Sequence, residues 1–449
     1  GGATIRGGYI RANPGKFLVE LTGGRSKRAV RPSLESGFRK PAFEQWAGAA
    51  KIGYGNTSTN YFHLSTFYAK DERESITGSN LEIAPRENLT LTPDFQVQFF
   101  NGRFTIGSEV TASLFTRDLN SSAVSMDEVD IPSFFTTIFT PRTSSRINYA
   151  GMADATLNLD FFNLGLGYER IQPGFESLGR GTVRDDQERI KISPSLRLMN
   201  NRINISSNVS LGRDNLLGNR VQTQTNTNAN SNIQFIITDY LNVNTTYGFV
   251  LNNITAEEID GQTTGSSQSQ ISHNVMLQPS LTLRREETTH NISFTGGYMS
   301  IESKFDNPGG VQANNYESQS ITSALNYAIT LPIGLTINSS VNYMTNSSDG
   351  IEIQNMGLNV GTSYAFFNRS LSVSANAGLN RNMSEREGPG GNLTDTELQQ
   401  LTGSLNSSYN LTEKDSFNIT LRTRTNSVLT GAGREFTELE GSFRYQRRF

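Results

Sequence analysis

The three histidines, His63, His273 and His290, are the first candidates for catalysis in this sequence. Histidine is the commonest general base, and a Ser-His-Asp or Ser-His-Asn arrangement requires one beside a nucleophile. Serine and asparagine are so abundant here that their presence selects no such arrangement. His63 lies in the middle of an expected strand, and we interpret the histidines as structural or rim residues. The sequence therefore predicts no catalytic residues and no enzyme.

Carboxylates are the second candidates, because clusters of them can bind calcium. There are two clusters: Asp127, Glu128 and Asp130 in a long loop, and Asp185, Asp186 and Glu188 at the start of a strand. Neither has the Asp-x-Asp-x-Asp-Gly spacing with which one loop wraps a calcium ion, so solvated loops are the preferred interpretation. The chain has no cysteine, which excludes thiolate metal sites and disulfides. No strand glycine precedes a helix, as a nucleotide cradle would require. We expect no metal and no cofactor.

Charged residues at alternating positions are more informative, because successive residues of a strand face opposite sides. On that basis ten charged side chains are expected to point into the lumen of a barrel: Lys191, Arg197, Arg284, Arg422, Arg424, Glu109, Asp154, Asp160, Glu438 and Glu440. Mixed charge on opposite walls is typical of a diffusion pore. Alternatively, these charges pair with one another around trapped water or a plug, since a barrel of more than about 20 strands is wide enough to need one.

The elements that must position these residues are strands, because a two-residue period runs along most of the chain. Residues 203–211, 241–249 and 417–424 alternate apolar and polar side chains. The last segment, 436–449, places Phe443, Tyr445 and Phe449 on one face, with Arg447 as a departure that costs little at a membrane rim. Carboxy-terminal strands of this kind resemble the signal that barrel-assembly machinery recognises.

Composition favours a membrane barrel over a helical membrane protein or a soluble fold. The chain of 449 residues is only 35% hydrophobic and has no run long enough for a membrane-spanning helix. A barrel explains this composition, because only alternate residues face lipid. The formal net charge of -3 gives no reason to expect nucleic acid as a partner.

The expected connections between strands fall into two length classes. Short turns are expected at 13–15, 101–102, 162–163, 200–201, 239–240, 332–334, 368–369 and 413–415. Longer connections are expected at 31–45, 72–87, 119–146, 173–186, 255–266, 305–314 and 385–392. Because outer-membrane barrels have short periplasmic turns and long external loops, this sorting predicts the orientation. Aromatic residues beside the short turns, such as Phe161 and Tyr240, fit an interfacial girdle.

Counting hairpins gives about 21 strands, an odd number in a class whose single-chain bacterial members normally have an even one. The first and the last expected strands both run toward the periplasm. We therefore expect residues 1–449 to form one barrel domain that lacks upstream strands, with about 22 or more strands in the full protein.

The first half of the chain contains five distinctive segments: 41–46 (PAFEQW), 67–71 (FYAKD), 74–76 (ESI), 139–145 (FTPRTSS) and 168–175 (YERIQPGF). Together these segments resemble a poorly characterised family of large outer-membrane barrels from Bacteroidota. The resemblance covers roughly residues 1–217. The resemblance implies an outer-membrane location and a β-barrel architecture. It supplies no catalytic or ligand residues.

The sequence thus predicts an all-β fold, an antiparallel up-and-down transmembrane β-barrel of the bacterial outer membrane. The leading functional hypothesis is a non-enzymatic, porin-like passage or scaffold. The alternative is an accessory subunit of a larger envelope machine, a secretion translocon or barrel-assembly complex, with a plugged lumen. Expected partners are outer-membrane lipid and lipopolysaccharide, the assembly machinery during biogenesis, and, under the alternative, other outer-membrane or periplasmic subunits.

Overall fold

A computed structural model gives the structure of the chain. It describes residues 4–31, 41–76, 83–124, 139–181, 184–259, 262–263, 265–306, 315–367, 370–387, 393–412 and 414–447. Phe449 of the expected assembly signal and the acidic cluster at 127–130 lie outside the described residues.

Regular structure in the described residues consists of strands and one 3-10 turn, η1 (Arg73–Ser75). The strands are β1 (Arg6–Ala12), β2 (Phe17–Lys27), β3 (Gln45–Gly55), β4 (Tyr61–Asp71), β5 (Glu87–Phe99), β6 (Phe104–Thr116), β7 (Ser145–Asn158), β8 (Phe162–Ile171), β9 (Gln187–Leu198), β10 (Ile203–Asp214), β11 (Gln222–Ile236), β12 (Leu241–Ala256), β13 (Glu258–Ile259), β14 (Gln262–Thr263), β15 (Ser267–Arg285), β16 (Thr288–Asp306), β17 (Tyr316–Thr330), β18 (Thr336–Ser348), β19 (Ile351–Phe366), β20 (Leu371–Glu387), β21 (Leu393–Asn410), β22 (Asp415–Thr430) and β23 (Phe436–Arg447). Among the described residues, no helical segment has the length and hydropathy needed to cross a membrane.

The strands follow an up-and-down topology. Within the described residues, 21 strands form one sheet, and consecutive strands pair antiparallel, while β13 and β14 form a separate small hairpin. The expected all-β, antiparallel, up-and-down fold and the expected strand number are confirmed.

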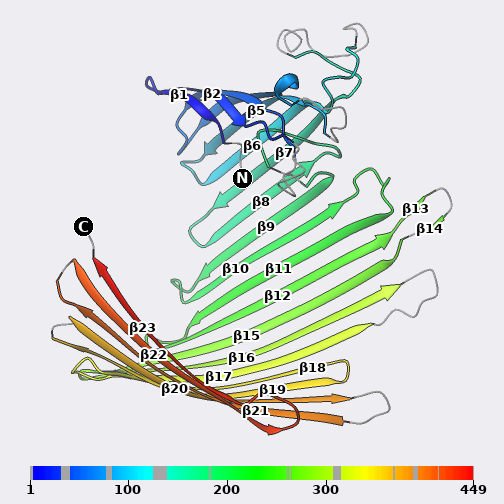
Figure 1. The fold of residues 1–449 in the computed structure, drawn as a ribbon. Coiled ribbons are helices and arrows are strands. Elements are labelled where there is room, and N and C mark those ends of the chain that lie inside the picture. The colour runs from blue at the N-terminus through cyan, green and yellow to red at the C-terminus, as the bar shows by residue number, and fades with distance from the viewer. Residues whose placement is uncertain are drawn as a thin grey trace. The chain divides into compact units, whose positions relative to one another are not determined.

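The chain divides into two compact units. Unit 1 comprises Gly1–Pro194, Ser210–Asn226 and Thr255–Thr264, and unit 2 comprises Ser195–Val209, Thr227–Ile254 and Gly265–Phe449. Strands β1 to β8 of unit 1 contain 7 to 14 residues. Most strands of unit 2 are longer (Figure 1). Strands β15 and β16 contain 19 residues each.

One face of unit 2 is apolar, and it is defined by the strand register. Residues directly opposite each other in an antiparallel pair point to the same side of the sheet. Successive pairs join six apolar residues on six neighbouring strands: Phe294, Leu325, Val341, Leu358, Leu379 and Leu401. We call this side the apolar face and the opposite side the polar face, in each unit.

The polar face of unit 2 carries asparagine, serine, threonine and glycine. Gly357 of β19 lies opposite Asn342 of β18 and Asn380 of β20. A Cβ atom at Gly357 would overlap the amide oxygens of both asparagines. Glycine is therefore required here, because it leaves space on the polar face for two amide side chains.

The apolar face of unit 1 has aromatic residues near its short turns. Phe17 and Tyr54 make an edge-to-face contact with ring centroids 5.0 Å apart. Phe99 and Phe104 flank the turn between β5 and β6, with centroids 6.0 Å apart. Aromatic rings at this level of the strands agree with the girdle expected from the sequence.

Backbone conformation confirms two of the expected short turns. Asn101 and Gly102 have φ values of 56° and 83°, and Asn200 and Asn201 have φ values of 53° and 67°. Asparagine and glycine adopt positive φ more readily than other residues, which explains their position at these turns.

Gly53 provides a test of the register, because it lies directly opposite His63. An added Cβ atom would overlap the His63 ring, which is buried and stacks on Tyr61 at 4.3 Å. We expect Gly53→Ala to lower the free energy of unfolding by about 1–3 kcal/mol, the usual cost of overpacking.

Urea unfolding of the purified, refolded chain would measure this effect. The matched control is Gly23→Ala, because a Cβ atom at Gly23 meets open space. Equal unfolding free energies for the two variants would contradict the pairing of β3 with β4.

Candidate functional site

The polar face of unit 1 is covered by the connection between β8 and β9, residues 172–186, which we call the covering loop; Thr182 and Val183 lie outside the described residues. Leu178 of this loop packs in a buried cluster with Ala47, Ala69 and Phe115. The strand register places all three of these strand residues on the polar face. The loop therefore lies across this face instead of extending away from the strands.

Asn88 of β5 holds the middle of the covering loop. Its side-chain oxygen accepts hydrogen bonds from the Leu178 amide at 3.0 Å and the Ser177 hydroxyl at 3.3 Å. Its side-chain nitrogen donates to the Ser113 hydroxyl at 2.8 Å and the Leu114 carbonyl at 3.1 Å. Asn88 is fully buried, so each of these bonds satisfies a group that water cannot reach.

Glu176 makes the next attachment of the loop. Its backbone carbonyl accepts a hydrogen bond of 2.6 Å from the Ser113 hydroxyl. Its carboxylate forms an ion pair with Arg117, which directly follows β6. Both contacts fasten the loop to the end of strand β6.

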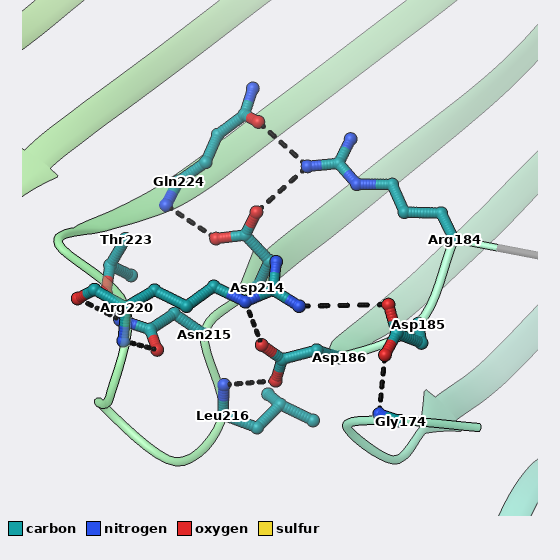
Figure 2. Close-up of polar contacts among 10 residues, drawn as sticks. All are labelled: Gly174, Arg184, Asp185, Asp186, Asp214, Asn215, Leu216, Arg220, Thr223 and Gln224. Atoms are coloured by element: carbon teal, nitrogen blue, oxygen red, sulfur yellow. Dashed lines mark hydrogen bonds and ion pairs between the residues drawn. The ribbon is translucent and has the colours of Figure 1, made fainter. Parts of the chain in front are cut away.

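Asp186 fixes the second stem of the covering loop (Figure 2). The carboxylate accepts a hydrogen bond from the Leu216 amide at 2.7 Å and lies 2.8 Å from Nε of Arg220. Asp185 accepts a hydrogen bond from the Gly174 amide at the first stem. The two aspartates thus join both stems of the loop to the connection between β10 and β11.

Arg184 extends this network (Figure 2). Its guanidinium donates to Asp214 at 2.9 Å and to the side chain of Gln224 at 3.0 Å. Asp214 also accepts a hydrogen bond from the Gln224 amide at 2.7 Å. Charge-assisted bonds of this kind are stronger than neutral ones, and together they give the loop a defined position.

The acidic pair at 185–186 therefore differs from the solvated loop expected from the sequence. Asp186 is 1% exposed, and its partners are Arg220 and a backbone amide. Among the described residues there is no group of three or more histidine and acidic side chains that could hold a metal ion. The carboxylates stabilise a loop conformation.

A cavity of about 300 Å³ lies between the covering loop and the strands below it. Glu109 of β6, Glu169 of β8 and Arg180 of the loop contribute the charged part of its lining. Glu109, one of the residues expected to face a lumen, therefore lies on the polar face and beneath the loop.

The other charged residues expected in unit 1 have mixed positions. Asp154 lies opposite Gly167 on the polar face, and Lys191 lies on the other side of the same glycine. Arg197, which belongs to unit 2, occupies the same alternate position of β9 as Lys191. The prediction that Asp160 points into the lumen from a strand is wrong. Strand β7 ends at Asn158, so Asp160 lies in the turn before β8 and not on a strand face.

In unit 2, four of the expected charged residues lie on β22 and β23. On the polar face, Arg422 lies directly opposite Glu440 in the strand register, and Arg424 lies directly opposite Glu438. All four line a hollow of about 340 Å³. The Arg424 guanidinium also lies 5.4 Å from the centroid of the Phe436 ring. Arg284 lies on the polar face of β15, opposite Thr289.

The carboxy-terminal strand, β23, places its aromatic residues on one face, as the sequence predicts. Phe443 and Tyr445 lie on the apolar face, where both rings contact Phe417, at 6.1 and 5.1 Å between centroids. Arg447 places a cation on the otherwise apolar face of this strand. Asp415 offsets its charge, because Oδ1 of Asp415 lies 3.7 Å from Nε of Arg447. The strand is therefore regular up to its last described residue.

The histidines have structural partners. Nδ1 of His63 lies 3.4 Å from Asp94 on the polar face. His273 and His290 contact tyrosine hydroxyls, those of Tyr247 at 3.0 Å and Tyr327 at 2.9 Å, on the apolar face. A hydrogen bond lowers the cost of a polar ring on an apolar surface, which agrees with a structural interpretation.

The covering loop is the feature that sequence reasoning missed. Residues 173–186 were expected to form a long external loop. Two signals in the sequence could have indicated otherwise, namely the apolar residues Phe175 and Leu178 in a polar loop, and the adjacent aspartates near its end. Both apolar side chains are buried in the structure.

No protein-family model matches this sequence, and no curated protein sequence is similar to it. Several solved structures are similar. OccAB4 of Acinetobacter baumannii is 12% identical, with 91% of this chain and 98% of that chain covered and a TM-score of 0.33. The outer membrane protein opdK of Pseudomonas aeruginosa is 11% identical, with 81% and 93% covered and a TM-score of 0.32.

The FrpB iron transporter of Neisseria meningitidis is 7% identical, with 92% of this chain and 62% of that chain covered and a TM-score of 0.37. These identities and TM-scores are low. The likeness therefore supports no statement about what this chain binds or transports.

The contacts of Asn88 predict how the loop responds to a mutation. Asn88→Ala removes four hydrogen bonds and leaves the buried Leu178 amide unsatisfied. An unsatisfied buried donor costs about 1–3 kcal/mol, so the loop should detach more often. We expect trypsin to cleave after Arg180 at least about tenfold faster, since about 1.4 kcal/mol corresponds to a factor of ten.

Mass spectrometry of timed digests would measure this rate. Asn244→Ala is the matched control, because Asn244 lies on the polar face of β12, in unit 2. If both variants are cleaved at the wild-type rate, Asn88 does not hold the loop.

Proposed function

We propose that this chain forms a transmembrane β-barrel in the outer membrane of a diderm bacterium and acts as a porin-like passage without catalysis. The observation that carries the proposal is the exposure of one continuous apolar face. In unit 2, Leu325, Val341 and Leu401 are 50%, 53% and 54% exposed, and they belong to one row of apolar residues across neighbouring strands.

A continuous exposed apolar surface is unfavourable in water and favourable against lipid. Strands can cross a bilayer only if the sheet closes, because an open edge would leave backbone groups unsatisfied in hydrocarbon. Closure would turn the polar face toward a lumen. The alternation of the two faces is the arrangement that outer-membrane barrels require.

Passage is supported by the chemistry of the polar face. Facing rows of arginine and glutamate, such as Arg422 with Glu440 and Arg424 with Glu438, line a hollow on this face. Mixed charges along a water-filled path favour polar solutes over apolar ones. The covering loop would narrow the lumen of such a passage, because it lies on the polar face.

The same loop favours a second candidate function, an accessory subunit of a larger envelope machine with a plugged lumen. The loop brings buried side chains such as Phe175 and Leu178 onto the polar face.

Under either function we propose membership of the Bacteroidota barrel family that segments such as 41–46 and 168–175 resemble. Lipopolysaccharide and the barrel-assembly machinery remain the proposed partners, the latter recognising the apolar face of β23 through Phe443 and Tyr445.

Arginine scanning tests whether the apolar face contacts lipid. Val243→Arg and Ile419→Arg place a cation on this face and should destabilise the chain by about 2–4 kcal/mol near the bilayer midplane. The neighbouring Asn244→Arg and Thr420→Arg face the polar side and should be tolerated. Unfolding in lipid vesicles measures the difference, and equal tolerance at both pairs of sites would exclude the proposed membrane face.

Conductance in planar bilayers tests the passage itself. We expect the purified chain to conduct ions, and Arg422→Gln combined with Arg424→Gln to shift selectivity toward cations. The shift should be modest, because Glu438 and Glu440 already offset these two cations. Lys414→Gln, in the turn before β22, is the control for a lost positive charge. A chain without conductance in any form would reject the passage and favour the plugged subunit.

A further inference from the structure

A cationic cavity lies beside the covering loop at the polar face of unit 1. Its volume is about 430 Å³, within the range of about 300–1,000 Å³ of small-molecule sites. Lys27, Arg86 and Arg180 line it together with Glu176. A second cavity of about 320 Å³ shares Lys27 and Arg86 and adds Arg117 and Asp71.

These cations come from separate elements that end at the same side of the sheet. Lys27 is the last residue of β2 and pairs with Gln45 on the polar face. Arg86 directly precedes β5, and Arg117 directly follows β6. Arg180 belongs to the covering loop, so the loop completes the cavity.

The two carboxylates near the cavities already have partners. Asp71 accepts hydrogen bonds from the Gln45 side chain at 2.8 Å and from the Arg86 amide at 2.9 Å, and its Oδ2 lies 3.9 Å from Nε of Arg86. Glu176 pairs with Arg117. Four cations and two carboxylates leave an excess of two positive charges. Within the described part of the chain, neither Lys27 nor Arg180 has a carboxylate within salt-bridge distance, although Asp71 attracts Lys27 at longer range.

We propose that this cavity binds a small oxygen-bearing dianion, inorganic phosphate or a short dicarboxylate, between Lys27 and Arg180. The net excess of two positive charges matches the charge of the ligand, and guanidinium and ammonium groups donate charge-assisted hydrogen bonds to its oxygens. Phe115 and Phe175 lie in the same lining and lower the local exposure to water, which strengthens the attraction.

The position of the cavity identifies the ligand as a solute and not as a lipid headgroup. Lys27 and Phe115 lie on the polar face of unit 1, the side opposite its exposed apolar residues such as Trp46 and Ile52. Binding at this site does not depend on conduction. The site can exist in an open passage or in a plugged subunit, so its test is separate from the bilayer measurement.

Isothermal titration of the purified full-length chain in detergent, at low salt, tests the proposal with inorganic phosphate and succinate as probes. We expect saturable binding of at least one probe, weakened about tenfold by Lys27→Gln or by Arg180→Gln, because each removes one charge-assisted contact. Added sodium chloride should weaken binding further through screening. Arg180→Lys retains the charge and should restore much of the affinity.

Lys16→Gln is the matched control, because Lys16 is an exposed residue of the turn between β1 and β2. It should leave affinity unchanged. Circular dichroism verifies that each variant keeps its strand content. Absence of saturable binding for both probes would overturn the proposal, and so would binding that both glutamine variants leave intact.

Discussion

The antiparallel register is the constraint on which the rest of this structure depends. Directly opposed residues point to the same side, so a single offset between two strands would exchange the apolar and polar faces of every later strand. The register holds over the row from Phe294 to Leu401, and β23 still has Phe443 on the same side as Ile419. Gly53 and Gly357 allow it to hold where a neighbouring strand carries a bulky polar side chain.

The covering loop depends on a different principle, the satisfaction of buried polar groups. The fully buried side chain of Asn88 forms hydrogen bonds with four partners. Asp186 is buried between a guanidinium and a backbone amide. Removing one partner leaves the others desolvated, so the loop is held by a group of mutually dependent bonds. The cationic cavity is a consequence, because the same loop brings Arg180 toward Lys27 and Arg86.

The sequence predicts most of the fold, because alternation is a local property. The apolar positions of 241–249 and 417–424, the turns at 101–102 and 200–201, and the location of Arg422 and Arg424 on the same face as the two glutamates of β23 all follow from the residues. The path of the covering loop does not follow, because Leu178 and Asn88 are 90 positions apart and no local pattern joins them. Asp160 was assigned to a face by parity alone, and the turn between β7 and β8 includes it.

The second stem of the covering loop has a consequence for the order of assembly. Asp186 and Arg184 are held by Leu216, Arg220 and Asp214, which follow them in the chain. The second stem therefore cannot reach its final position until the hairpin of β10 and β11 has formed, whereas the middle of the loop contacts strands that lie far upstream. Closing such distant contacts costs little extra entropy once intervening strands have paired. A chain interrupted after β9 would keep the attachments of the loop to Asn88 and Arg117 and would lack those of its second stem.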